Sequence, residues 1–196
     1  EFHHNRNPYP TIVQGRMFML AANELHAVDA YTGRHLWKAT VPESPKSERR
    51  LADHRQFSRP TDQNLIASKD RVYVLRENDA QVFDAAKGTA LTAMTVPNDE
   101  AVWDEARIEG DTMFVAIGKR LVALDRVSGA VKWAHVSEQE HVAFGLGDGH
   151  VFTVGYSTAR GQSQAKIGAE KNELIVLKAS TGEKLWSEPL DAQARK

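Results

Sequence analysis

Short apolar runs separated by turn residues dominate the pattern of the chain. In the first copy of the pattern the runs cover residues 11–13, 17–21, 25–28 and 35–39, with Gly, Asn or Asp between them. Such spacing is typical of an antiparallel meander. The second and third runs are apolar at consecutive positions, which indicates strands that are buried on both faces. No stretch has a sustained helical period, so we expect no helix.

The pattern repeats, and each repeat contains a version of one stretch, AVDAYTGRHLW at residues 27–37. Close copies occupy residues 123–133 and 176–186, and a degenerate copy occupies 82–92. The glycines of successive copies lie 55, 41 and 53 residues apart. A four-stranded unit with this period predicts an all-β fold, a β-propeller of four-stranded antiparallel blades with four blades present.

These repeats also define the expected organisation of the chain. We expect a lead-in segment at residues 1–9, a single propeller domain at 10–190 and a tail at 191–196. The predicted blades lie at about 10–40, 61–96, 106–136 and 141–190. Because every blade needs two neighbours, four blades either close as a compact ring or form part of a larger propeller. Self-association through open blade ends is a further expectation.

The residues of the repeated stretch have structural roles that follow from their chemistry. The Asp can accept backbone N–H groups across the turn between the third and fourth strands, and the Gly permits a positive φ there. The Trp, four residues after the Gly, can lie against the adjacent blade. Thr92 replaces Trp in the second copy and Lys178 replaces Asp in the fourth, so we expect weaker contacts at those two positions. The predicted structural residues are Asp29, Gly33, Trp37, Asp84, Gly88, Asp125, Gly129, Trp133, Gly182 and Trp186.

With its Asp, Thr-Gly and Trp positions repeated from about residue 10 to residue 190, the chain resembles the Trp-docking repeat of pyrroloquinoline-quinone-type propellers. The resemblance implies a propeller fold. It also implies two kinds of activity, because the family includes quinoprotein dehydrogenases, which use a quinone and calcium, and non-enzymatic scaffolds such as the outer-membrane assembly lipoprotein. A location in the bacterial periplasm or cell envelope is implied in the same way.

The sequence gives little support to a quinone-dependent dehydrogenase activity. Those enzymes close eight blades around the quinone, often with a vicinal disulfide, whereas this chain has four recognisable repeats and no cysteine. The acidic cluster at residues 98–105 is interpreted as a solvated loop, and Gly145–Gly149 as a hairpin, since a dinucleotide fingerprint requires a following helix. No Ser/His/Asp set or metal-ligand spacing is present. We therefore expect no catalytic residue, no quinone and no calcium. The alternative is a portion of a quinone-dependent or sugar-processing oxidoreductase whose other blades are absent.

Charge and composition narrow the possible partners. The chain has 196 residues and a net charge of −1, which gives no general attraction to nucleic acid or to an anionic membrane. No apolar run approaches the roughly 20 residues of a membrane-spanning helix, so no transmembrane segment is expected. The start at Glu1, without a signal-like segment, is interpreted as that of a processed or excised piece.

Two long connections, at residues 41–60 and 155–172, interrupt the rhythm of the strands. Since strand direction alternates within a blade, both are expected on the same face of the propeller. Each has a net charge of +2, which favours an acidic partner or an anionic ligand. The open alternative is that they are simply polar, mobile loops. The candidate binding residues are Arg49, Arg50, His54, Arg55, Arg59, Arg160 and Lys166, with His54 adding a charge that depends on pH near neutrality.

The sequence thus predicts a non-catalytic scaffold whose partner is a protein or the rest of a larger propeller. Nucleic acid is not expected as a partner, because aromatic residues are not interleaved with the basic residues of either connection.

Overall fold

Sixteen β-strands form four antiparallel sheets of four strands each. A computed structural model describes residues 10–21, 23–42, 65–76, 79–96, 103–137, 140–156 and 172–190. No helix occurs in these ranges, as the sequence predicts. The fold class predicted from the repeats, an all-β protein with four four-stranded blades, is confirmed.

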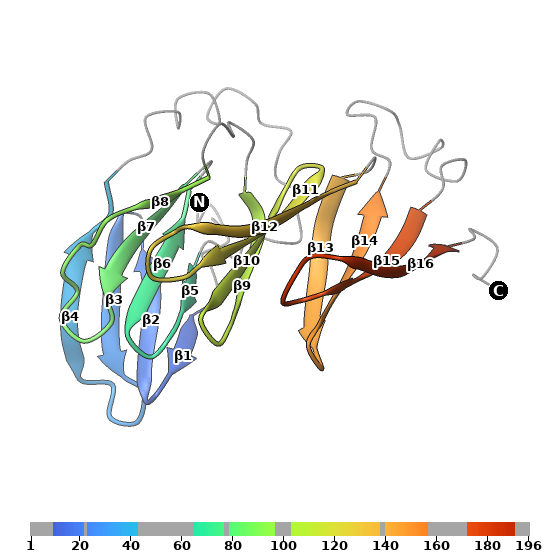
Figure 1. Ribbon diagram of the computed structural model, residues 1–196. Helices are drawn as coiled ribbons and strands as arrows, with labels where there is room; N and C mark the ends of the chain where they lie inside the picture. The colour runs from blue at the N-terminus through green and yellow to red at the C-terminus, as the bar shows by residue number, and fades with distance from the viewer. Residues whose placement is uncertain are drawn as a thin grey trace, which may run out of the picture. The chain divides into compact units, whose positions relative to one another are not determined.

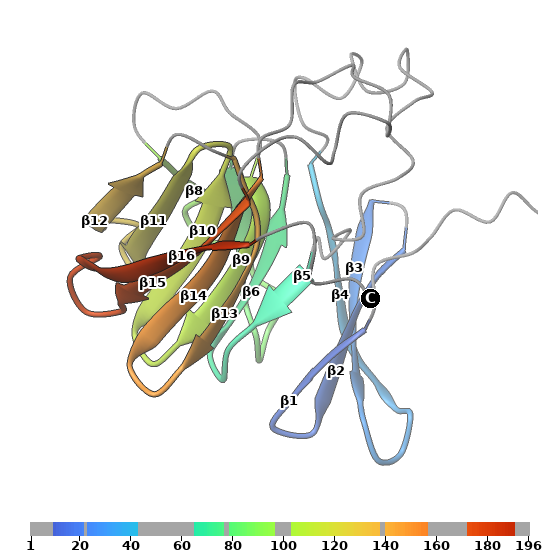
Figure 2. The ribbon, with the colours of Figure 1, turned by 90° about the vertical axis from the view of Figure 1, so that its right-hand side faces the viewer.

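Each sheet is a meander in which the strands pair in chain order, and we number the sheets as blades 1 to 4 (Figures 1 and 2). Blade 1 consists of β1 (Thr11–Val13), β2 (Arg16–Ala21), β3 (Glu24–Asp29) and β4 (His35–Thr40). Blade 2 consists of β5 (Leu65–Ala67), β6 (Arg71–Leu75), β7 (Asp79–Asp84) and β8 (Met94–Thr95). Blade 3 consists of β9 (Trp103–Glu109), β10 (Thr112–Ile117), β11 (Arg120–Asp125) and β12 (Val131–Val136). Blade 4 consists of β13 (Glu140–Gly147), β14 (His150–Tyr156), β15 (Asn172–Lys178) and β16 (Lys184–Leu190).

The chain divides into two compact units, residues 1–100 with blades 1 and 2 and residues 101–196 with blades 3 and 4. The boundary between the units comes after blade 2, whose repeat has Thr92 at the Trp position. Each unit contains an apolar core in which side chains from both of its blades pack together. In unit 1 this core includes Phe18 and Leu25 of blade 1 with Val72 and Phe83 of blade 2. In unit 2 it includes residues such as Phe114 and Leu121 of blade 3 with Val151 and Leu177 of blade 4.

The pairing register is the same in blades 1, 3 and 4. In blade 1, Phe18 of β2 pairs with Ala27 of β3, which pairs with Trp37 of β4. The corresponding rows are Phe114–Ala123–Trp133 in blade 3 and Phe152–Val176–Trp186 in blade 4. The repeated aromatic positions of the sequence therefore form one cross-strand row per blade, on one face of the sheet.

Blade 2 departs from the predicted strand bounds. The sequence predicts a fourth strand at residues 91–94, but β8 covers only Met94–Thr95, preceded by an isolated bridge between Phe83 and Ala90. Thr92 and Ala93 are exposed, and the carbonyl of Leu91 accepts from Nε2 of Gln81 at 3.4 Å. Position 92, where the other three blades have a Trp, has an exposed Thr in this blade, and the regular strand is confined to Met94 and Thr95.

Candidate functional site

The predicted basic residues cannot be placed in the fold. Arg49, Arg50, His54, Arg55, Arg59, Arg160 and Lys166 all lie outside the described residues. The strands that flank them are described, however, and they show where each long connection leaves its blade. The first begins after β4, where the N–H of Val41 donates to the carbonyl of Asn23 at 2.7 Å. It therefore starts beside the β2–β3 connection, at the edge of blade 1 opposite the turn at residues 29–33.

The second long connection leaves blade 4 after β14 and rejoins it at β15, and these strand ends lie at the edge of the blade opposite the turn at residues 178–182. In unit 1 the edge near Val41 also contains Arg76. Its guanidinium Nε donates to Oδ1 of Asp79 at 2.6 Å and its Nη1 donates to the carbonyl of Pro42 at 3.1 Å. This pair fixes the first residues of the 41–60 segment against the β6–β7 connection.

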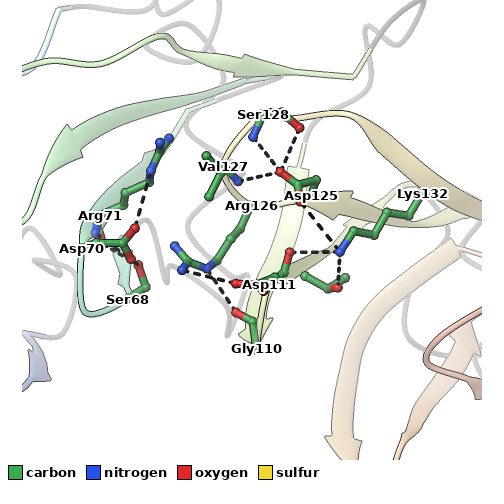
Figure 3. Close-up of polar contacts among 11 residues, drawn as sticks. Ser68, Asp70, Arg71, Gly110, Asp111, Asp125, Arg126, Val127, Ser128 and Lys132 are labelled. Atoms are coloured by element: carbon green, nitrogen blue, oxygen red, sulfur yellow. Dashed lines mark hydrogen bonds and ion pairs between the residues drawn. The ribbon is translucent and has the colours of Figure 1, made fainter.

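The aspartates of the repeated stretch shape the turns between the third and fourth strands. Oδ1 of Asp29 accepts from the backbone N–H groups of Tyr31 and Thr32, at 3.0 and 2.8 Å, and from the Thr32 hydroxyl. Oδ1 of Asp125 accepts in the same way from Val127 and from the N–H and hydroxyl of Ser128 (Figure 3). Asp84 makes the two backbone contacts of this set, to Ala86 and Lys87.

These hydrogen bonds stabilise the charged form of the carboxylates. The N–H of Thr32 lowers the pKa of Asp29, with further contributions from the Thr32 hydroxyl and the N–H of Tyr31. The N–H of Ser128 lowers the pKa of Asp125, assisted by the Ser128 hydroxyl. These carboxylates therefore serve to stabilise the backbone of the turns.

The glycine at the end of each turn has a left-handed backbone. Gly33, Gly88, Gly129 and Gly182 have φ values of 71°, 72°, 75° and 73°, which a residue with a Cβ adopts only with strain. In the turns of blades 1, 2 and 3 the glycine N–H donates at 2.8 Å to the carbonyl of the Asp four residues earlier. In blade 4 Gly182 makes the same bond to Lys178, also at 2.8 Å.

The tryptophan of one blade lies on the glycine turn of the next blade in the same unit. In unit 1 the indole Nε1 of Trp37 donates to the carbonyl of Ala85 at 3.2 Å, and the ring is so close to Gly88 that a Cβ there would lie 2.5 Å from Cε3. In unit 2, Nε1 of Trp133 donates to the carbonyl of Ala179 at 2.9 Å, and a Cβ at Gly182 would again lie 2.5 Å from Cε3.

Trp186, the corresponding residue of blade 4, is 49% exposed, in contrast to Trp37, which is 8% exposed. The repeated motif predicts the same role for both residues. The difference arises because Trp37 is covered by the following blade of its unit. The exposed ring is therefore available for contact with another surface.

The acidic cluster at residues 98–105 was interpreted from the sequence as a solvated loop, and for Glu105 that interpretation is wrong. Glu105 lies in β9 and is 4% exposed. Oε1 accepts from Nε of Arg107 at 2.9 Å, and Oε2 accepts from the N–H of Phe144 in blade 4 at 3.2 Å. Arg107 also lies over the Phe144 ring, 5.8 Å from its centroid. The sequence gives no signal for this link, since the amide that Glu105 binds lies 39 positions further along the chain. The remaining cluster residues at 98–100 lie outside the described ranges.

Calcium is bound in proteins by six to eight oxygen ligands, which include Asp and Glu carboxylates. In the described part of the chain, no three His, Asp or Glu side chains gather closely enough to hold a metal ion. None of the described residues form a helix long and apolar enough to cross a membrane.

Comparisons with solved structures show the same architecture at low sequence identity. The quinohemoprotein alcohol dehydrogenase from Comamonas testosteroni matches with a TM-score of 0.65 and 14% identity, over 93% of this chain and 34% of the enzyme. BamB from Moraxella catarrhalis matches with a TM-score of 0.50 and 16% identity, over 88% of this chain and 57% of that protein. The Pan2 WD40 domain of Neurospora crassa matches with a TM-score of 0.62 and 11% identity, over 94% of this chain and 52% of that chain. This chain thus spans between about a third and somewhat more than half of these structures, and their likeness shows the fold alone.

No curated protein sequence matches the chain. The family model described as outer membrane protein assembly factor BamB matches residues 2–135 and 118–196, and the two matches together cover nearly the whole chain. The four four-stranded blades are consistent with a PQQ-like propeller. The chain therefore belongs to the PQQ-like β-propeller family whose model is described as outer membrane protein assembly factor BamB.

Proposed function

We propose that the chain is a non-catalytic PQQ-like propeller module that acts as a binding or assembly scaffold in the periplasm or cell envelope. Its long connections, residues 41–60 and 155–172, supply the contacts to an acidic protein partner or an anionic ligand. The family description, which names an outer-membrane assembly factor, supports the scaffold role and the location.

The observation that carries the proposal is that the repeated residues have structural roles. The aspartates bind turn amides, the glycines provide the left-handed turns, and Trp37 and Trp133 lie on neighbouring blades. These side chains are therefore occupied by structure. Loops on a rigid scaffold are where binding residues concentrate, and here the two long connections have the excess of positive charge.

The binding role can be tested with two sets of substitutions in the full chain. One set is Arg49→Ala, Arg50→Ala and Arg55→Ala, and the other is Arg160→Ala and Lys166→Ala. The probe is a fluorescently labelled polyglutamate peptide, whose binding is followed by anisotropy at low and at high salt. We expect each set to weaken binding and to reduce its salt dependence without lowering Tm, because charges on long connections contribute to association rather than to the core.

A matched control removes two exposed cations outside the long connections, Lys69→Ala and Lys87→Ala. The control variant is expected to bind like the wild type. Equal binding by the wild type and both arginine-containing sets would exclude these connections as the contact surface.

The competing function, a portion of a quinone-dependent oxidoreductase, has a separate test. Pyrroloquinoline quinone and calcium are added to the chain, and the absorption spectrum of the quinone and the Tm of the protein are recorded. A scaffold gives no spectral change and no stabilisation, whereas binding of the quinone would raise Tm by mass action and support the oxidoreductase.

A further inference from the structure

A second cross-strand row of blade 3 lies beside the row of Trp133 and has an ionisable side chain at each end. Glu105 of β9 pairs with Ala116 of β10. Ala116 also pairs with Leu121 of β11, whose partner in β12 is His135. Ala116 and Leu121 belong to the apolar core that blades 3 and 4 share. Since paired residues point to the same face of a sheet, Glu105 and His135 stand at the two ends of the face that packs on blade 4.

Two charged side chains of blade 4, Lys184 of β16 and Glu173 of β15, act electrostatically on His135. Nζ of Lys184 lies 4.0 Å from Oε1 of Glu173, so the two form a loose ion pair opposite the imidazole. At the other end of the row the carboxylate of Glu105 is bound by Arg107. Between these ends the described residues of β10 and β11 in the row are apolar, so His135 is the basic group of the row.

This environment favours the uncharged form of His135. Partial burial of the imidazole lowers the pKa of His135, the ammonium group of Lys184 lowers it further, and the carboxylate of Glu173 opposes both effects. A protonated imidazole would lose part of its hydration and would also face a lysine. Separation of the two blades relieves both costs, so protonation favours an open arrangement.

The corresponding contact of unit 1 has alanine at both of these positions. Ala39, two residues after the Trp of blade 1, stands where blade 3 has His135, and it packs against the apolar core of its unit. Ala90, two residues after the glycine of the blade 2 turn, stands where blade 4 has Lys184. The two units therefore share the Trp contact and differ in the groups beside it, which makes unit 1 an internal control for unit 2.

We propose that the contact between blades 3 and 4 is acid-sensitive and opens when His135 takes up a proton, whereas the contact between blades 1 and 2 does not respond to pH in this way. The inference concerns unit 2 itself and does not depend on a binding partner. It gives the fold a means of responding to mild acid, because His is the side chain that ordinarily titrates near neutral pH.

The direction of the effect follows from proton linkage. A His whose pKa is lowered in the folded state binds fewer protons there than in the open state. The contact is therefore at full strength above the pKa of the open state, about 6.5 for an unperturbed His. Its stability is lost as the pH falls from that value through the pKa of His135 in the folded state.

Hydrogen exchange of the full chain, measured by mass spectrometry at about pH 7.5 and about pH 5.5, tests the proposal across the ordinary pKa of His. Exchange rates are corrected for the intrinsic effect of pH. In the wild type we expect the amides of β12 and β15 to lose protection at the lower pH, by up to about tenfold for each pH unit between the pKa values of the open and folded states. The amides of β4 and β7 should keep theirs.

Three variants separate the imidazole from general effects. His135→Ala gives blade 3 the alanine of blade 1 and should abolish the pH dependence in β12 and β15. His35→Ala removes an exposed imidazole of blade 1 and should behave like the wild type. Lys184→Met removes the ammonium group and keeps a long side chain. In this variant the pKa of His135, followed by NMR of the ring protons, should rise and the pH dependence should become smaller, which a merely space-filling role would not produce.

Three outcomes would overturn the proposal. The first is equal protection of β12 and β15 at both pH values in the wild type. The second is a pH dependence that persists in His135→Ala, because another group would then be responsible. The third is an unchanged pKa of His135 in Lys184→Met, since the lysine would then have no part in the response.

Discussion

The two filled Trp contacts, one in each unit, use different turns to hold the same ring. Trp37 lies on a turn that begins with Asp84 and ends with Gly88, whereas Trp133 lies on one that begins with Lys178 and ends with Gly182. In blade 2 the carboxylate of Asp84 accepts two backbone N–H groups. In blade 4 the carbonyl of Lys178 accepts from the N–H of Thr181 instead, at 3.2 Å. The ring contact with the glycine is nevertheless the same, so the carboxylate is dispensable for the shape of the turn.

The comparison separates the roles of the residues in the repeat. The glycine and the carbonyl beside it form the surface on which the indole lies, and both are retained in the two units. The aspartate stabilises the turn from within and can be replaced. The sequence-based expectation of a weaker contact at Lys178 thus concerns the stability of the turn, while Nε1 of Trp133 still lies 2.9 Å from the Ala179 carbonyl.

Of the substitutions that test this comparison, removal of the indole ring should have the largest effect on stability. Trp37→Ala deletes a side chain that is 8% exposed, so we expect the free energy of unfolding of unit 1 to fall by about 3–5 kcal/mol. Trp133→Ala should lower the stability of unit 2 by an amount at the lower end of that range, about 3 kcal/mol, because Trp133 is only partly buried. Trp186→Ala, at an exposed position, should change stability by less than about 1 kcal/mol.

Urea denaturation of the three variants at low protein concentration, followed by circular dichroism, measures these differences. The ratio between the variants matters more than any single value. Equal losses for Trp37→Ala and Trp186→Ala would contradict the view that the following blade covers the ring.

The next largest effect should come from the glycines under the rings. Gly88→Ala and Gly182→Ala place a Cβ 2.5 Å from the indole and also impose a left-handed backbone on an alanine. We expect a loss of about 1–2 kcal/mol from the backbone and a further loss of about 1–3 kcal/mol from the displaced ring. Thermal and urea denaturation report the sum.

Gly149→Ala is the matched control for the backbone contribution. Its φ is 73°, the same as at Gly182, and a Cβ there meets nothing within 4 Å. The difference between Gly182→Ala and Gly149→Ala therefore measures the displacement of the ring alone. If the two variants lose the same stability, the ring moves without cost and the contact does not fix the turn.

The sequence predicts those parts of the fold that depend on interactions between residues close together in the chain. The turn made by Asp29 and Gly33 depends on residues within five positions of one another, so the repeated stretch is sufficient to predict it. The fold class and the four blades follow from the repetition of such turns. The bounds of β8 were predicted wrongly, because its pairing with β7 is limited to Asp79–Thr95 and Ala80–Met94, and the extent of strand pairing depends on tertiary context.

The buried Glu105 was missed for a related reason. Its partner amide belongs to Phe144, 39 positions away, and a single sequence gives no sign of so distant a pairing. The candidate binding residues from Arg49 to Lys166 lie outside the described ranges, and they stay a prediction. Trp37 and Trp186 occupy the same position of the repeat, so the sequence predicts the same environment for both. Only the structure shows that Trp37 is buried and Trp186 is half exposed.

The smallest expected effect tests the role of the missing carboxylate directly. Lys178→Asp places a carboxylate where Asp84 has one, so the N–H groups of Ser180 and Thr181 gain an acceptor, and unit 2 should become more stable by about 0.5–1.5 kcal/mol at neutral pH. The N–H groups at the equivalent positions lower the pKa of Asp29, where they belong to Thr32 and Tyr31, and of Asp125, where they belong to Ser128 and Val127. A carboxyl with a lowered pKa in the folded state stabilises above its pKa in the unfolded chain, and the gain is lost as pH falls through the folded pKa. The gain should therefore disappear in acid, below about pH 4. Lys178→Asn is the control, because its amide oxygen accepts the same bonds without titrating, so its effect on stability should not change over this pH range. A gain that is the same for both variants at every pH would show that the charge of the carboxylate contributes nothing to the turn.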